Sequence, residues 1–174
     1  KILWFPRLQY DVDHLHLVTW REMARELEKR GHVVRVAVSG IPAAAAPPGW
    51  IRLPLLPVKG FRLAWFWLAG HVAFAFHYFA YRPDGVLLDV HTAGFGFPWA
   101  LLPSRATWIL DQRTPIAHTS MRRGRFRRWF ERGLTAVAMG LVRRHFDGLT
   151  TITAAFRAAV SERSGVQLER IGVW

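Results

Sequence analysis

Residues 17–39, LVTWREMARELEKRGHVVRVAVS, decide the fold class of this chain. Leu17, Trp20 and Ala24 recur at the three- and four-residue spacing of one helix face, which predicts an amphipathic helix. Gly31 supplies the left-handed residue that ends many helices. The apolar run that follows it predicts a buried strand. A helix that leads directly into such a strand indicates an α/β architecture.

The same alternation of apolar runs and helical patterns continues along the chain, so we predict a doubly wound, Rossmann-like fold. Its mostly parallel sheet has about seven strands, with helices on both faces, and residues 1–174 form a single domain. The predicted strands are Ile2–Phe5, Val33–Ser39, Ile51–Leu56, Gly85–Val90, Ala106–Asp111, Gly148–Thr153 and Glu169–Trp174. Further helices are predicted over 60–81, 93–102, 121–145 (broken near Gly133) and 154–164.

Composition narrows the class of protein. The 174 residues contain no cysteine, which excludes a disulfide framework and a thiolate nucleophile. Hydrophobic residues make up 51% of the chain, too many for a disordered protein. The net charge of +12 favours phosphate-rich partners such as a nucleotide-linked substrate, anionic lipid or nucleic acid.

Three segments together resemble the GT-B glycosyltransferases of family 4, also called group 1. EMARELEKRGHVVRVAVS resembles their first helix and second strand, and RPDGVLLDVH (82–91) resembles their fourth strand. FDGLTTITAAFRAAV and the following ERIGVW resemble the helix and strand that lead to their interdomain linker. The segments occur in the family's order and cover nearly the whole chain.

The resemblance implies the amino-terminal, acceptor-binding half of a two-domain enzyme. It implies a nucleotide-sugar donor held by a carboxyl-terminal domain outside this chain, retention of anomeric configuration and no essential metal. We therefore expect no cofactor in this domain and no turnover from this chain alone. The expected partners are the donor domain and a sugar or lipid-linked acceptor.

Ligands of open parallel sheets gather at the carboxyl ends of the strands, which selects the candidate residues. Asp111 and His91 are the candidates for a catalytic role. The predicted acceptor-binding residues are Tyr10, Asp13, His14, His91, Asp111, Arg113 and Thr114.

Each candidate has a structural alternative. His91 can instead bond a backbone carbonyl, and Asp111 can form an ion pair with Arg113. Asp13 can cap a helix, as can Thr153. A metal cluster of Asp11, Asp13, His14 and His16 is disfavoured, because the two histidines point in different directions and no distant ligand is evident. We predict no metal site.

Residues 63–81, LAWFWLAGHVAFAFHYFAY, have no formally charged side chain and are just long enough to cross a bilayer core of about 30 Å. A crossing is disfavoured, because His71 and His77 interrupt the run and because it would place strands of one sheet on opposite sides of the membrane. The two favoured interpretations are a helix buried against the sheet and a helix whose outer aromatic face lies among lipid headgroups.

Residues 121–145 carry eight arginines and one glutamate, mixed with aromatic residues. This pattern suits an anionic membrane surface. The predicted membrane-binding residues are Arg122, Arg123, Arg125, Phe126, Arg127, Arg128 and Trp129.

The sequence thus predicts a glycosyltransferase acceptor domain that is peripheral on the cytoplasmic face of the cell membrane and acts on a lipid-linked or envelope-glycan acceptor. The alternative is a non-catalytic, basic Rossmann-like module that binds anionic lipid or nucleic acid. Nucleic acid is the less expected partner, because no recognised nucleic-acid module is present. A nicotinamide dehydrogenase is disfavoured, because no G-x-G-x-x-G follows the first strand.

Overall fold

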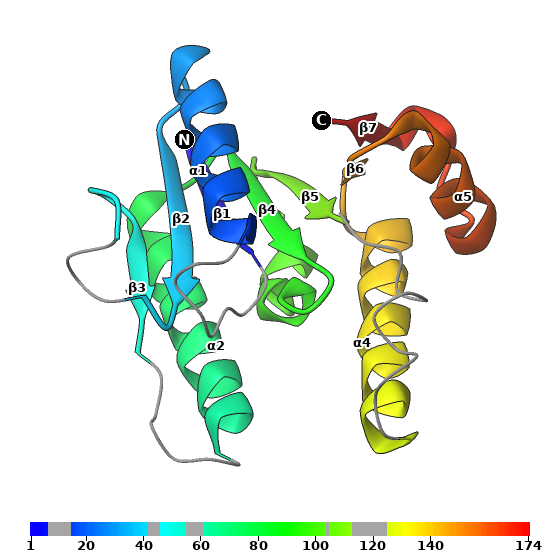
Figure 1. Ribbon diagram of the computed structural model, residues 1–174, viewed down its shortest axis with the longest axis horizontal. Helices are drawn as coiled ribbons and strands as arrows, with labels where there is room; N and C mark the ends of the chain where they lie inside the picture. The colour runs from blue at the N-terminus through cyan, green and yellow to red at the C-terminus, as the bar shows by residue number, and fades with distance from the viewer. Residues whose placement is uncertain (7–14, 42–45, 55–60, 104, 113–124) are drawn as a thin grey trace. The chain divides into compact units, whose positions relative to one another are not determined.

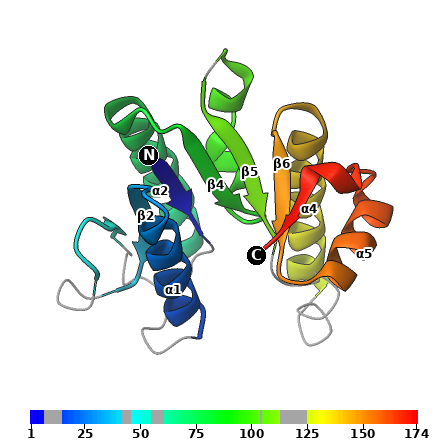
Figure 2. The same cartoon turned by 90° about the horizontal axis from the view of Figure 1, so that it is seen from above.

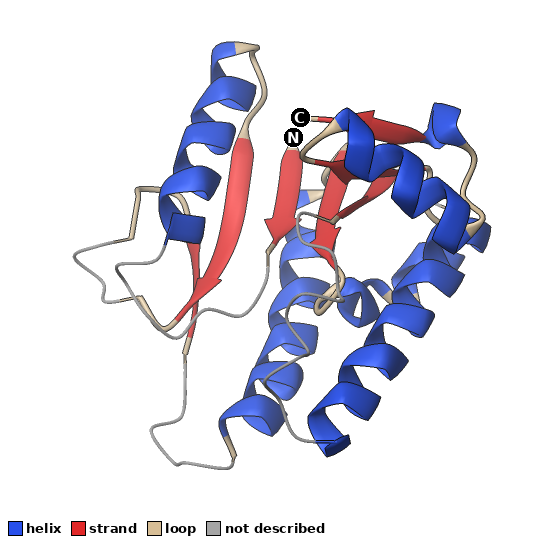
Figure 3. Cartoon of the chain, turned by 45° about the vertical axis from the view of Figure 1, so that its right-hand side comes forward, coloured by secondary structure: helices blue, strands red, loops and turns tan. Residues whose placement is uncertain are grey.

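The structure is a computed structural model that describes residues 1–6, 15–41, 46–54, 61–103, 105–112 and 125–174. The chain divides into two compact units, Lys1–Leu87 and Leu88–Trp174. Helices and strands alternate along both units (Figure 3). The predicted α/β, Rossmann-like class is confirmed.

Seven strands form the sheet, in the order β3-β2-β1-β4-β5-β6-β7 (Figure 1). Within the two units the pairs β1/β2, β2/β3, β5/β6 and β6/β7 are parallel, as the continuous apolar runs predict. The strands are β1 (Ile2–Phe5), β2 (Val34–Ser39), β3 (Ile51–Leu53), β4 (Gly85–Asp89), β5 (Thr107–Asp111), β6 (Gly148–Thr151) and β7 (Ile171–Val173).

In the first unit, α1 (Leu15–Lys29) and α2 (Arg62–Tyr81) cover opposite faces of β1 and β2 (Figure 2). Trp20 and Ala24 of α1 are buried, as the amphipathic pattern predicts. Gly31 has a φ of 86°, so the chain turns into β2 through the left-handed conformation that glycine adopts most easily.

Aromatic residues make specific ring contacts in the core of the first unit. Phe5 of β1 meets Phe74 of α2 edge to face, with ring centroids 5.2 Å apart. Phe74 also stacks on Tyr78, at 5.8 Å. Edge-to-face and offset pairs of this kind add to the stabilisation from burial alone.

No helix among the described residues has the length and apolarity needed to cross a bilayer. Phe66 and Phe74 of α2 are buried, and α2 packs on β1 and β3. One face of α2 is therefore buried against the sheet, as one of the two interpretations of residues 63–81 predicts.

The second unit corrects two helix predictions. Residues 93–102 form two short 3-10 helices, η2 (Ala93–Gly96) and η3 (Trp99–Leu101), in place of one α-helix. Glycine at positions 94 and 96 weakens an α-helix, and Pro98 has no backbone N–H to continue it.

The predicted break near Gly133 is wrong, because α4 (Arg125–Arg144) continues through it. A helical glycine costs only about 1 kcal/mol. Ala138 and Val142 are buried on the same helix, which packs on β5 and η2. The helix α5 (Ala154–Ser164) and the short η4 (Leu168–Arg170) complete the unit.

Two glycine-to-alanine changes in the second unit should alter stability in opposite directions. A Cβ at Gly96 would lie 2.8 Å from the Trp108 ring and 2.9 Å from Leu88. Gly96→Ala should therefore lower the free energy of unfolding by about 1–3 kcal/mol. Gly133→Ala, with nothing within 4 Å, should raise it by about 0.5–1 kcal/mol. Urea unfolding followed by circular dichroism measures both, and changes of the same sign would contradict this packing.

His77 of α2 should make stability depend on pH. Burial lowers the pKa of His77 in the folded chain, and the nearby Arg35 guanidinium lowers it further. As pH falls below about 6.5, the unfolded chain binds this proton first, so stability should decrease until the lowered folded pKa is passed. In His77→Gln, the urea midpoint should change less between about pH 7 and pH 5 than it does in the unchanged chain. If the urea midpoint of the variant depended on pH as strongly as that of the unchanged chain, His77 would not be the source of the pH dependence.

Candidate functional site

Asp89, the last residue of β4, holds His91 by two hydrogen bonds. Asp89 Oδ1 accepts from the backbone N–H of His91 at 2.8 Å, and it lies 2.8 Å from His91 Nδ1. Buried Thr92 closes the turn, because its Oγ1 accepts from the Asp89 N–H at 2.9 Å and its N–H donates to the Asp89 carbonyl at 2.9 Å. The imidazole is thus fixed at the carboxyl end of a strand.

The Asp89 carboxylate determines which nitrogen of His91 is available to a ligand. An ionised carboxylate only accepts hydrogen bonds, so Nδ1 must carry a proton to donate to it. In the neutral ring, Nε2 then holds a lone pair. The His91 side chain is 35% exposed, so a ligand can approach it. The sequence suggested a backbone carbonyl as the structural partner of His91 and did not identify Asp89.

Asp111 ends β5 and is almost fully buried, at 2% exposure. Its Oδ1 accepts from Thr150 Oγ1 at 3.1 Å and from Trp174 Nε1 at 2.9 Å. Thr150 lies in β6, and Trp174 directly follows β7. One carboxylate oxygen therefore joins three neighbouring strands at their carboxyl ends.

Gln112 follows Asp111 and was missed by the sequence analysis. Its N–H donates to the Thr150 carbonyl at 2.9 Å, which extends the pairing of β5 with β6. Its side chain is 6% exposed, and in the described part of the chain Oε1 has no hydrogen-bond partner. A buried acceptor left unpaired costs about 1–3 kcal/mol. Glutamine carries no formal charge and belongs to no motif, so only burial reveals it.

Several predicted site residues lie outside the described residues: Tyr10, Asp13, His14, Arg113, Thr114, Arg122 and Arg123. Asp11 is also outside them, as is the side chain of His16, so the disfavoured metal cluster is not described. The backbones of Arg125, Phe126, Arg127 and Arg128 belong to α4, but their side chains lie outside the described part. Trp129 is described, and its side chain is 68% exposed.

Among the candidates, the structure thus describes His91 and Asp111, both in the second unit. They differ in environment, since the first has a partly exposed imidazole and the second an interior carboxylate. Thr153 caps α5, because its Oγ1 accepts from the Phe156 N–H at 3.1 Å. This confirms the structural alternative for Thr153.

The model of Glycosyltransferase Family 4 matches residues 18–174. None of the curated proteins compared with the chain matches it at a significant level.

Three solved structures share the fold. A UDP-GlcNAc 2-epimerase from Methanocaldococcus jannaschii has a TM-score of 0.60 at 12% identity, over 99% of this chain and 44% of that one. A UGT transferase from Siraitia grosvenorii, in complex with UDP, has a TM-score of 0.57 at 15% identity, over 99% of this chain and 50% of that one. The glycotransferase of kitacinnamycin has a TM-score of 0.51 at 20% identity, over 98% of this chain and 50% of that one. The chain spans about half the length of these structures.

The hydrogen bond from Trp174 to Asp111 predicts a stability effect. Trp174→Phe keeps an aromatic ring but removes the N–H donor, which leaves a buried carboxylate oxygen with one donor fewer. The free energy of unfolding should fall by about 1–3 kcal/mol in urea titrations. The control is Trp129→Phe at an exposed position, which should change it by less than about 0.5 kcal/mol. Equal effects of the two changes would argue against this role of Asp111.

Proposed function

Because the chain belongs to glycosyltransferase family 4, we propose that the carboxyl ends of its strands bind the acceptor in a sugar-transfer reaction. The observation that carries the proposal is the Asp89–His91 pair, which holds an accessible imidazole at a strand end. A sugar acceptor presents hydroxyl groups, and the Nε2 lone pair of a neutral His91 accepts a hydrogen bond from such a group.

In this proposal, His91 fixes the direction in which the acceptor hydroxyl oxygen points. Transfer requires that oxygen to meet the anomeric carbon of the donor, and correct placement of the two reactants supplies much of the rate. Asp89 keeps the proton on Nδ1 and prevents ring rotation. Gln112 and Asp111, which are neighbours at the carboxyl end of β5, are further candidates for contact with acceptor hydroxyls.

We propose that the donor is a nucleotide sugar bound by a second domain of the same enzyme. The half-length coverage of the similar structures supports this division. The reaction proceeds with retention, as the family resemblance implies, and this chain alone does not turn over.

We further propose a lipid-linked or envelope-glycan acceptor and a peripheral position on the cytoplasmic face of the membrane. The support is the charge of residues 121–145, which contain eight arginines and only one glutamate, together with the exposed Trp129 ring of α4. Basic residues near an anionic surface each contribute on the order of 1 kcal/mol.

The test is the change His91→Ala in the complete protein that carries this chain. Initial rates of sugar transfer are measured with nucleotide-sugar donors and a glycolipid acceptor fraction. Loss of one hydrogen bond to the acceptor should reduce kcat/KM for the acceptor about tenfold, while KM for the donor stays unchanged.

His145→Ala is the matched control. His145 is an exposed histidine of the same unit. It precedes β6 and therefore lies near the amino end of that strand, whereas His91 follows the carboxyl end of β4. Its removal should leave both constants unchanged. An unaltered acceptor constant in His91→Ala, or a loss confined to donor binding, would reject His91 as an acceptor contact.

A further inference from the structure

α2 has a second apolar face, which is exposed. Its buried face includes Phe66 and Phe74. Opposite that face stand four large apolar side chains that are each more than half exposed: Leu68, Val72, Phe76 and Phe79. We call these four residues the α2 stripe.

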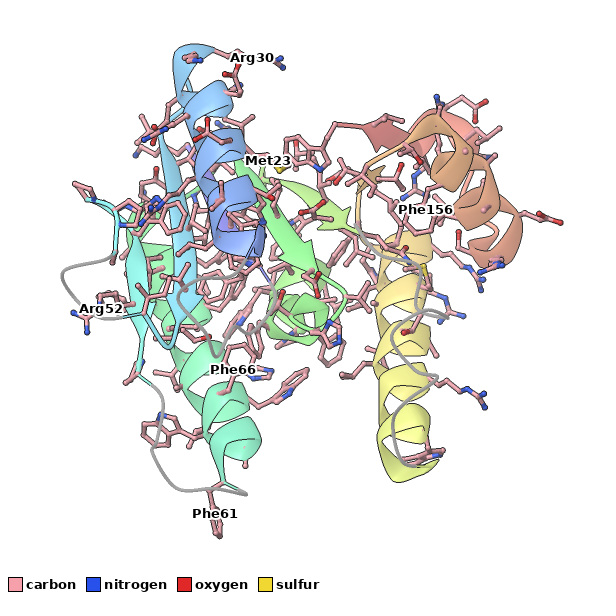
Figure 4. All side chains as sticks on the ribbon, viewed as in Figure 1. Met23, Arg30, Arg52, Phe61, Phe66 and Phe156 are labelled. Carbon is pink, nitrogen blue, oxygen red and sulfur yellow. The ribbon has the colours of Figure 1, made fainter. Side chains whose placement is uncertain are left out.

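The α2 stripe is continuous along the helix. Its members follow one another at spacings of four, four and three residues, so they fall within an arc of about 80° at 100° per residue. Phe61, at the start of α2, lies on the same arc and is also exposed; Figure 4 shows it projecting away from the strands. Soluble proteins rarely expose an apolar surface of this kind without a binding role.

The stretch of sequence that contains the α2 stripe is basic. From residue 29 to residue 83 the chain has no aspartate or glutamate and seven lysines or arginines. Two of these, Arg52 of β3 and Arg82 at the end of α2, are exposed and described. Arg52 points outward in Figure 4. An apolar stripe within an acid-free, cationic segment is complementary to a surface with negative charges over an apolar interior.

We propose that the α2 stripe docks on an anionic phospholipid surface, with its side chains among the upper acyl chains and the flanking cations at the phosphates. α2 lies in the membrane interface and does not cross it. A second copy of this chain fits less well, because each copy carries a net charge of +12 and the two would repel. This proposal deepens the membrane part of the proposed function and adds a contact surface separate from the arginines of 121–145.

The chain contains no cysteine, so a single introduced cysteine can be labelled at one defined site. Val72→Cys and Val18→Cys form a matched pair, since Val72 is 64% and Val18 is 57% exposed and both lie on helices of the first unit. Each variant is labelled with an environment-sensitive dye. It is then mixed with phosphatidylcholine vesicles, with or without phosphatidylglycerol, at about 0.05 M and 0.5 M salt.

We expect the dye at position 72 to shift to the blue and gain at least about twofold in emission with anionic vesicles at low salt, as a dye does when it enters an apolar phase. The dye at position 18 should not respond. Val72→Gln should weaken vesicle binding about tenfold, and Val18→Gln should leave it unchanged. Equal circular dichroism spectra for the two glutamine variants establish that both are folded.

Three outcomes would overturn the proposal. In the first, the protein binds the vesicles but the emission of the dye at position 72 does not change. In the second, that emission changes with protein concentration in the absence of lipid, which indicates a second copy. In the third, the amount of protein bound to vesicles does not depend on lipid charge or salt. Sugar transfer to a water-soluble acceptor is measured in parallel with the complete protein that carries this chain. Loss of the dye response with normal transfer rejects only the docking surface, whereas a normal dye response with an unaffected His91→Ala variant rejects only the acceptor site.

Discussion

Parallel pairing of β5, β6 and β7 is the constraint on which the second unit depends. It brings the ends of three strands to one edge, where a single oxygen of Asp111 accepts hydrogen bonds from Thr150 and Trp174. A buried carboxylate is costly unless such donors surround it. The two donors stabilise the charge, and the charge in turn fixes the three strand ends relative to one another.

The two carboxylates at strand ends differ in what they hold. Asp111 is interior, and its Oδ1 bonds side chains from neighbouring strands. Asp89 holds a partly exposed imidazole through Nδ1 of His91. The same residue type thus stabilises the sheet in one place and orients an accessible side chain in the other, because burial and partners differ.

α2 shows why apolar composition alone does not identify a membrane span. One face supplies Phe66 and Phe74 to the core, and the other presents the α2 stripe to the surroundings. Averaged along the sequence, the two faces form one continuous apolar run. Only their positions around the helix separate a packing surface from an exposed one, and that separation rests on the contacts of α2 with β1 and β3.

The sequence by itself determined the order of strands and helices, since short apolar runs and the helical spacing of Trp20 and Ala24 are local patterns. It also placed the candidates His91 and Asp111 at strand ends, because strand ends can be located from those runs. It overestimated the effect of Gly133, where packing outweighs a small local cost. The hydrogen-bond partners of both candidate residues were decided only by the tertiary structure. Trp174 meets Asp111 across 63 positions, because β6 lies between β5 and β7. A local pattern cannot encode a hydrogen bond that forms only once three strands have paired.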